Sequence, residues 1–270
     1  MRAAEFVTLA YLGYLMLLTV NRRLAPQRRA QIQTLSAIAI LAVLGLAGGS
    51  HIPGLAIMRD WMPGLYILGG YWLSGRFYTG PMLTWERQLA EIDRRLFAAL
   101  SRWSTAWTAP PMLLAALELA YLSVYVLLPA GFALLYFSRT AFDIDQFWTV
   151  VLVAELACYA TLPWVQTRPP RALETDRRRG VPDALRQANL IVLRYGSIQV
   201  NTFPSGHAAG AVATGLAVAI WRPKTGLVLL GWAIAVVVGS VVGRYHYAAD
   251  SALGAAVGIA AWLVILWIWP

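Results

Sequence analysis

Two short segments, some forty residues apart, contain two of the three histidines of this 270-residue chain. The first is Pro204-Ser205-Gly206-His207, at the start of an apolar stretch. Proline is disfavoured inside a helix and serine is a good N-cap, so we expect a helix to begin here with Gly206 and His207 in its first turn. Backbone N–H groups at a helix start attract anions, and a histidine beside them can donate a proton. This segment alone is equally compatible with a helix-start histidine that has no chemical role.

The second segment contains His246 and Asp250. Residues four apart share one face if the segment is helical. Asp250 can then accept the proton of one ring nitrogen, which leaves the other nitrogen of His246 free as a nucleophile. The alternative is an interfacial salt bridge. However, Asp250 opens the apolar run Ser251 to Trp269, and charged groups at such positions are functional by default.

Arginines are concentrated in residues 165–203, directly before the first of these two segments. In Arg168-Pro169-Pro170-Arg171 the prolines stiffen the chain and hold the flanking guanidinium groups in place. The planar fork of arginine pairs with two phosphate oxygens at once. We expect these residues to bind phosphate: Arg168, Arg171, Ser205, Gly206 and Arg244. Together with two histidines and an aspartate, they are the parts needed to move a phosphoryl group.

The composition indicates that a membrane positions these residues. Hydrophobic residues make up 59% of the chain, charged residues 13%, and the mean hydropathy is +0.59. The sequence therefore predicts an all-α, polytopic transmembrane bundle with about six to eight membrane helices. The candidate segments are Phe6–Val20, Thr34–Gly49, Ile57–Ser74, Met112–Phe137, Phe147–Trp164, Ser205–Trp221, Gly226–Tyr245 and Ser251–Trp269.

We divide the chain into an N-terminal transmembrane hairpin, residues 1–50, and a catalytic membrane domain, residues 51–270. Within the second part, the pattern over residues 84–107 alternates apolar and charged positions every three or four residues. It predicts an amphipathic helix on the membrane surface. Glycines at four-residue spacing late in the chain predict that the last three helices pack tightly together.

The charge and cysteine content restrict the possible partners. The net charge of +9 favours contact with anionic membrane lipids over nucleic acid in a chain this apolar. The single cysteine, Cys158, excludes a disulfide within the chain and a cysteine-based metal site. No acidic cluster suits magnesium. We therefore expect no metal and no cofactor.

Loop charge predicts the orientation in the membrane, which we take to be the plasma membrane. With eight crossings, the loops 21–33, 76–110 and 165–203 lie on one side, and they hold sixteen of the 22 Lys and Arg residues. The positive-inside rule then places these loops and the phosphate site in the cytosol. If the third segment, which contains Pro63 and three glycines, does not cross, the catalytic loop moves outside.

The second half of the chain resembles the type 2 phosphatidic acid phosphatase superfamily of lipid phosphatases. Arg168-Pro169, Pro204 to His207, and His246 with Asp250 match parts of its three motifs. Two positions differ: Thr161 stands where the family has lysine, and Ser240 where it has arginine, a role that Arg244 could take. The compact Tyr-His-Tyr spacing is similar to the inositol phosphorylceramide synthase branch.

The resemblance implies that His246 forms a phosphohistidine, that Asp250 orients it, and that His207 protonates the leaving oxygen. It leaves two activities open, hydrolysis of a phosphorylated lipid or transfer of its phosphoryl headgroup to a lipid alcohol. Family relatives that work on the outer face argue against a cytosolic site. A third possibility is a transporter without enzymatic activity, since Glu118 and Glu155 lie within apolar segments and buried carboxylates can mark ion paths. They can equally form hydrogen bonds between helices.

Overall fold

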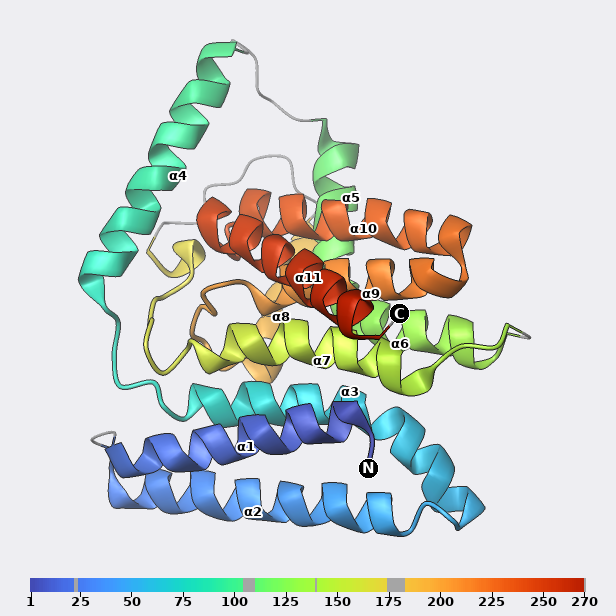
Figure 1. Ribbon diagram of the computed structural model, residues 1–270. Coiled ribbons are helices and arrows are strands. Elements are labelled where there is room, and N and C mark those ends of the chain that lie inside the picture. Colours follow the sequence, from blue (N-terminus) through green and yellow to red (C-terminus); the bar gives the residue numbers. More distant parts are fainter. Residues whose placement is uncertain (22–23, 104–109, 139, 174–182, 270) are drawn as a thin grey trace.

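The computed structural model describes residues 1–21, 24–103, 110–138, 140–173 and 183–269 (Figure 1). Over these ranges the chain forms helices and no strand, which confirms the all-α fold. The helices are α1 (Ala3–Asn21), α2 (Pro26–Gly48), α3 (Pro53–Gly75), α4 (Leu83–Trp103), α5 (Pro111–Leu122), α6 (Val124–Tyr136), α7 (Ile144–Ala160), η1 (Pro170–Ala172), α8 (Asp183–Gly196), α9 (Gly206–Trp221), α10 (Pro223–Val242) and α11 (Ala248–Ile268).

Four of the described helices, α1, α2, α10 and α11, are long and apolar enough to cross a membrane. The pair α5 and α6 would be a fifth crossing, broken by a bend of 65°. Helix α9 is apolar but has 16 residues, and α3 and α7 run beside the others through the bundle. The chain is thus an integral membrane protein, and the predicted six to eight crossings are an approximate count.

Helix α3 carries charges that its neighbours neutralise. The guanidinium of Arg59 donates to Glu5 of α1 at 2.5 Å, and Arg2 donates to Asp60 at 2.6 Å. Paired in this way, both charges of α3 are accommodated at one end of the bundle. The helix bends in its first half (Figure 1), where Pro63 lacks an amide hydrogen and cannot complete the backbone ladder.

Helix α9 lies at the centre of the catalytic part and packs against α7, α10 and α11. Small residues permit the close approach. A β-carbon added to Gly258 of α11 would lie 2.6 Å from the carbonyl oxygen of Ala209, and one added to Gly215 would lie 3.0 Å from the side chain of Leu230 in α10. The predicted tight unit is therefore organised around α9. Gly206 and Gly210 of α9 instead face α7.

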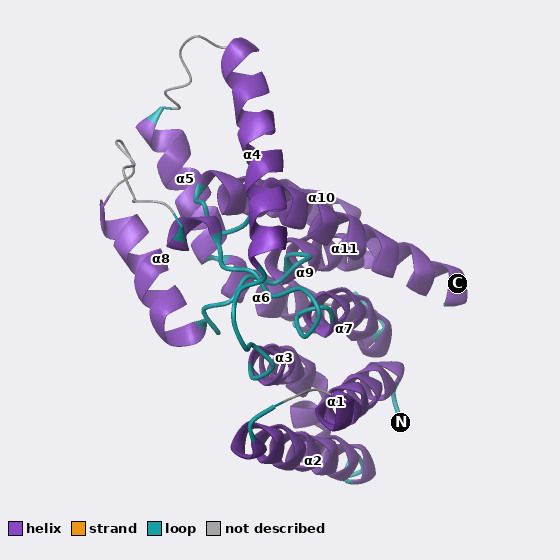
Figure 2. Ribbon diagram, turned by 90° about the vertical axis from the view of Figure 1, so that its left-hand side faces the viewer, coloured by secondary structure: helices purple, strands orange, loops and turns teal. Residues whose placement is uncertain are grey.

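Helix α4 crosses one end of the bundle (Figure 2), as expected for a helix that lies along a membrane surface. Its buried stripe consists of Glu86, Leu89 and Asp93, which dock on the catalytic loops. Trp85 and Ile92 are exposed and are available to lipid. The helix ends at Trp103 in the described part of the chain, and the rest of the predicted range, 104–107, lies outside the described residues.

Candidate active site

The predicted site residues gather at the end of the bundle that α4 covers. The segment after α7, the segment before α9 and the turn between α10 and α11 meet there (Figure 2). The two helix starts are joined directly, because the amide of Ser205 donates to the carbonyl oxygen of Asp250 at 2.9 Å. Ser205 also caps α9 as predicted, accepting from the amide of Ala208 at 3.4 Å.

His246 and Asp250 form the expected pair. Nδ1 of His246 lies 3.0 Å from Oδ2 of Asp250, and both side chains are buried. The same oxygen accepts from Nδ2 of Asn201 at 2.7 Å. Asn201 is itself held by Thr167, through a backbone bond of 2.8 Å and a side-chain bond of 3.2 Å. This chain of contacts fixes the ring of His246 and leaves its Nε2 for chemistry.

His246 lies in the turn between α10 and α11, in a setting that favours the neutral imidazole. Burial lowers the pKa of His246, and the positive charge of Arg171 lowers it further. A neutral ring is the form that can act as a nucleophile. A hydrogen bond to a carboxylate, such as the one to Asp250, would stabilise the positive charge that develops on a ring that attacks.

His207 lies in the first turn of α9, where the sequence predicts it. Its ring centroid is 5.8 Å from that of His246. The rings of Tyr121 and Tyr125 flank it, at centroid distances of 5.5 Å and 5.3 Å. The two histidines therefore lie next to each other and line the same small cavity, one backed by a carboxylate and the other flanked by aromatic rings.

Of the three predicted phosphate-binding arginines, Arg171 lies with the histidines. It lines a small cavity of about 20 Å³ together with His207 and His246. Its amide donates to the carbonyl oxygen of Arg244 at 3.0 Å, its Nη1 donates to that of Tyr245 at 3.4 Å, and its guanidinium lies 5.7 Å from the Tyr245 ring centroid. These contacts hold a cation beside the ring of His246.

Arg168 and Arg244 are engaged by helix α4. Nε and Nη2 of Arg168 donate to the two carboxylate oxygens of Glu86 at 3.0 Å and 2.9 Å, and this hydrogen bonding lowers the pKa of Glu86. Nη1 of Arg244 donates to Asp93 at 2.7 Å. Asp93 also accepts from the amide of Ala248, at the start of α11. Both arginines thus link α4 to the catalytic segments.

Two amides at the start of α9 have protein partners. The amide of Gly206 donates to the hydroxyl of Thr202 at 3.3 Å, and the amide of Ser205 donates to the carbonyl oxygen of Asp250. Phosphate binding by Ser205 and Gly206 remains a prediction, as it does for the arginines.

Several residues that position the site belong to no sequence motif. Asn201 is one, and a second group surrounds Tyr245, next to His246. The Tyr245 ring stacks on Tyr121 with centroids 4.0 Å apart, and its hydroxyl donates to Glu118 at 2.5 Å. Glu118 also accepts from Arg186 and Asn189 of α8. In the sequence, Glu118 stands out as a carboxylate within an apolar segment. In the structure it forms hydrogen bonds between helices.

The two positions that differ from the family motifs have structural partners. Thr161, at the end of α7, donates its hydroxyl to the carbonyl oxygen of Cys158 at 2.7 Å and also contacts that of Phe203. The hydroxyl of Ser240 pairs with that of Ser251 at 2.8 Å, and its carbonyl oxygen accepts from the amide of His246 at 3.0 Å. Thr161 and Ser240 therefore shape the backbone around the histidines. Neither carries the positive charge that the family motifs have at these positions, and in this chain Arg171 places a positive charge beside the histidines.

Fold and site together define an all-helical membrane protein with a two-histidine centre of the phosphatase type. The chain belongs to the PAP2 superfamily, whose family model matches residues 87–264. The match includes every predicted site residue and leaves out the N-terminal hairpin and α3. Searches of curated proteins and of solved structures give no match. Membership indicates phosphatase-type activity on phosphate esters.

Proposed function

We propose that the protein hydrolyses a phosphate ester or anhydride of a membrane lipid through a phosphohistidine at His246. The observation that carries the proposal is the buried Asn201–Asp250–His246 chain with His207 and Arg171 beside it. It supplies an oriented nucleophile, a proton donor and a cation around one small space. The apolar bundle would hold the lipid part of such a substrate.

In the first step Nε2 of His246 attacks phosphorus, and the bond from phosphorus to the lipid oxygen breaks. Protonated His207 gives its proton to that oxygen. In the second step neutral His207 removes a proton from water, and the water oxygen attacks phosphorus. The phosphorus–nitrogen bond breaks, which releases phosphate and restores neutral His246. Arg171 stabilises the charge on the equatorial oxygens in both steps.

A lipid alcohol in place of water would make the protein a phosphotransferase. An apolar cavity beside His207 favours this second candidate, because His207 could deprotonate an alcohol there as readily as water. A transporter, the third possibility, predicts no turnover at all.

Purified protein, assayed for free phosphate against a panel of lipid phosphates, tests the proposal. We expect phosphate release without an added acceptor. Release that requires diacylglycerol, ceramide or inositol would favour the transferase, and no turnover under any condition would refute both enzymatic candidates. The His246→Ala protein is the control for contaminating phosphatases.

The chemistry above requires no divalent metal, since Arg171 supplies the positive charge. We expect full activity in EDTA and inhibition by vanadate, which copies trigonal-bipyramidal phosphorus. Activity lost in EDTA and restored by magnesium would contradict this mechanism.

We further propose that the site faces the cytosol across the plasma membrane. Arg28 donates to the carbonyl oxygen of Tyr78, and Arg76 to Gln31, so the start of α2 and the end of α3 share the catalytic end of the bundle. The arginine-rich loops on that end then follow the positive-inside rule. Single cysteines replacing Gln31 and Glu174 in a Cys158→Ala background test this in intact cells. Protection of both from an impermeant maleimide is expected, and labelling of the Glu174→Cys protein would place the site outside.

A further inference from the structure

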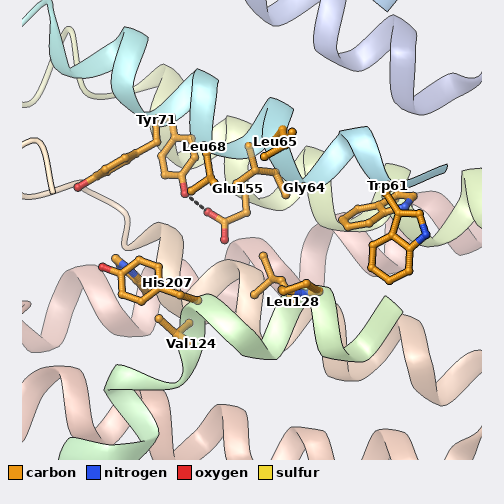
Figure 3. Close-up of a pocket in the computed structure, with 14 residues that line it drawn as sticks. Trp61, Gly64, Leu65, Leu68, Tyr71, Val124, Leu128, Glu155 and His207 are labelled. Carbon is orange, nitrogen blue, oxygen red and sulfur yellow. Dashed lines mark hydrogen bonds between the residues drawn. The ribbon is translucent and has the colours of Figure 1, made fainter. Parts of the chain in front are cut away.

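A second, larger cavity opens from His207 toward the middle of the bundle. Its volume is about 380 Å³, within the range of small-molecule sites. Leucines and aromatic rings from α3, α6 and α7 line most of it. In Figure 3 His207 lies toward one end, Trp61 at the other, and Glu155 between them. The cavity therefore adjoins the reacting centre on the membrane side.

One wall of this cavity reaches the surface of the bundle. Helices α3 and α6 meet where Trp61 packs on Phe132, with ring centroids 4.7 Å apart. Closer to the catalytic end, Leu65 and Leu68 line the cavity and are 57% and 38% exposed. A chain from the surrounding lipid can enter at these leucines.

Glu155 of α7 is the one acidic residue among those that line this cavity. Its side chain is buried and its carboxyl points into the cavity, where it accepts from the hydroxyl of Tyr159 (Figure 3). Among the described residues no cation pairs with it. A carboxyl group in an apolar cavity without an ionic partner is costly, and such groups mark substrate paths in membrane proteins.

The start of α9 is built around this carboxyl. A β-carbon added to Gly206 would lie 2.8 Å from Oε2 of Glu155, and one added to Gly210 would collide with Oε1. The two glycines thus allow Glu155 to lie against the helix turn that carries His207. A lipid whose phosphorus is at the histidines would have its first few carbon atoms beside this carboxyl.

We propose that this cavity binds the lipid alcohol part of the substrate, and that Glu155 accepts a hydrogen bond from a hydroxyl or N–H group on it. The inference rests on the proposed function and restricts its range of lipid substrates. The preferred substrates carry a hydrogen-bond donor within a few bonds of the phosphoester, and polyprenyl phosphates, which carry none, are poor substrates. If the protein is a transferase, the same cavity receives the acceptor alcohol.

The test compares two substrates in nanodiscs, a monoacylglycerol phosphate with a free 2-hydroxyl and its 2-deoxy analogue. Leaving a buried polar group without its hydrogen-bond partner costs about 1–3 kcal/mol, or roughly five- to hundredfold in kcat/KM. We expect the wild type to prefer the hydroxyl substrate by at least about fivefold. Glu155→Leu should lower kcat/KM for that substrate alone, which brings the ratio near one.

Two further variants keep the result interpretable. Glu155→Gln retains an acceptor oxygen and should keep part of the preference, even if Glu155→Leu does not fold. Ala157→Val, at an exposed position on the same helix, should leave the ratio unchanged. Equal kcat/KM for both substrates in the wild type, or an equal loss for both in Glu155→Leu and Glu155→Gln, would overturn the proposal and leave Glu155 a structural role.

A binding measurement separates this proposal from the proposed activity. Monoacylglycerol should raise the Tm of the wild type more than its deoxy analogue does, and Glu155→Gln should reduce the difference. If the protein turns over no lipid phosphate of the panel, the proposed function fails, but a selective Tm shift would still support the lipid alcohol site. The absence of any selective shift would refute the site.

Discussion

The two histidines of the centre have opposite surroundings. His246 has a carboxylate behind it and an amide behind the carboxylate, so its ring is fixed in one orientation. His207 has tyrosine rings on two sides and borders an apolar cavity. The difference is consistent with the proposed roles, in which His246, whose ring is fixed, attacks phosphorus and His207, beside the cavity, gives up and regains a proton.

The largest effects should come from removing either ring, and the leaving group separates the two. With a lipid phosphate, both His246→Ala and His207→Ala should lose activity to background, a loss of roughly 10⁶ by analogy with protease triads. With a nitrophenyl phosphate ester, whose leaving group needs no proton, His207→Ala should still form the phosphoenzyme. His246→Ala should form none.

Trapping of labelled phosphate on the protein measures this directly. Phosphoenzyme in the His246→Ala protein would contradict the assigned roles, and so would its absence in a folded His207→Ala protein that hydrolyses the activated ester. Asp250→Asn should keep the fold and cut the rate by roughly 10⁴, the effect of an orienting aspartate in a protease triad.

Arg171 and Arg168 can be compared in the same way, because the first lies with the histidines and the second is paired with Glu86. Arg171→Ala should lower kcat by about 10³, as loss of a transition-state arginine does. Arg168→Ala should cost less than about tenfold, because Arg168 is 38% exposed and paired with Glu86, and such pairs contribute little. Steady-state kinetics on the two purified proteins decide this. Equal losses would mean that Arg168 leaves Glu86 to bind phosphate.

Asn201 tests how far the fixed orientation of His246 depends on its second partner. Asn201→Ala removes the hydrogen bond to Asp250 and should lower kcat/KM by about ten- to hundredfold. In an Asp250→Asn background the same change should have little further effect, because both act through His246. Additive losses in the double variant would show that Asn201 acts on something else.

The smallest effect concerns the titration of His246. A protein with His51→Gln and His207→Gln retains His246 as its one histidine, so its ring resonances can be followed by NMR. Because burial and Arg171 lower its pKa, the midpoint should lie below 6.5. The folded protein then holds fewer protons than the unfolded chain, so this group makes the free energy of unfolding decrease as the pH falls below 6.5. A midpoint above 7 would contradict the assignment.

The sequence by itself determined the all-helical membrane fold, the helix that begins at Ser205, and the pairing of His246 with Asp250. Each depends on neighbours within one or two turns: long apolar runs, a cap beside a proline, and residues four apart on one face. The same local logic predicted an amphipathic helix after residue 83, which the structure shows across the end of the bundle.

Only the tertiary structure decided which arginine faces the histidines and which residues support them. Arg168, Arg171 and Arg244 look equivalent along the chain, and contacts with Glu86 and Asp93, over 80 and 150 positions away, draw two of them to α4. Asn201 reaches Asp250 across 49 positions, and Glu155 meets the start of α9 because two glycines leave space for it. Such pairings depend on how helices cross, a property that no local spacing encodes.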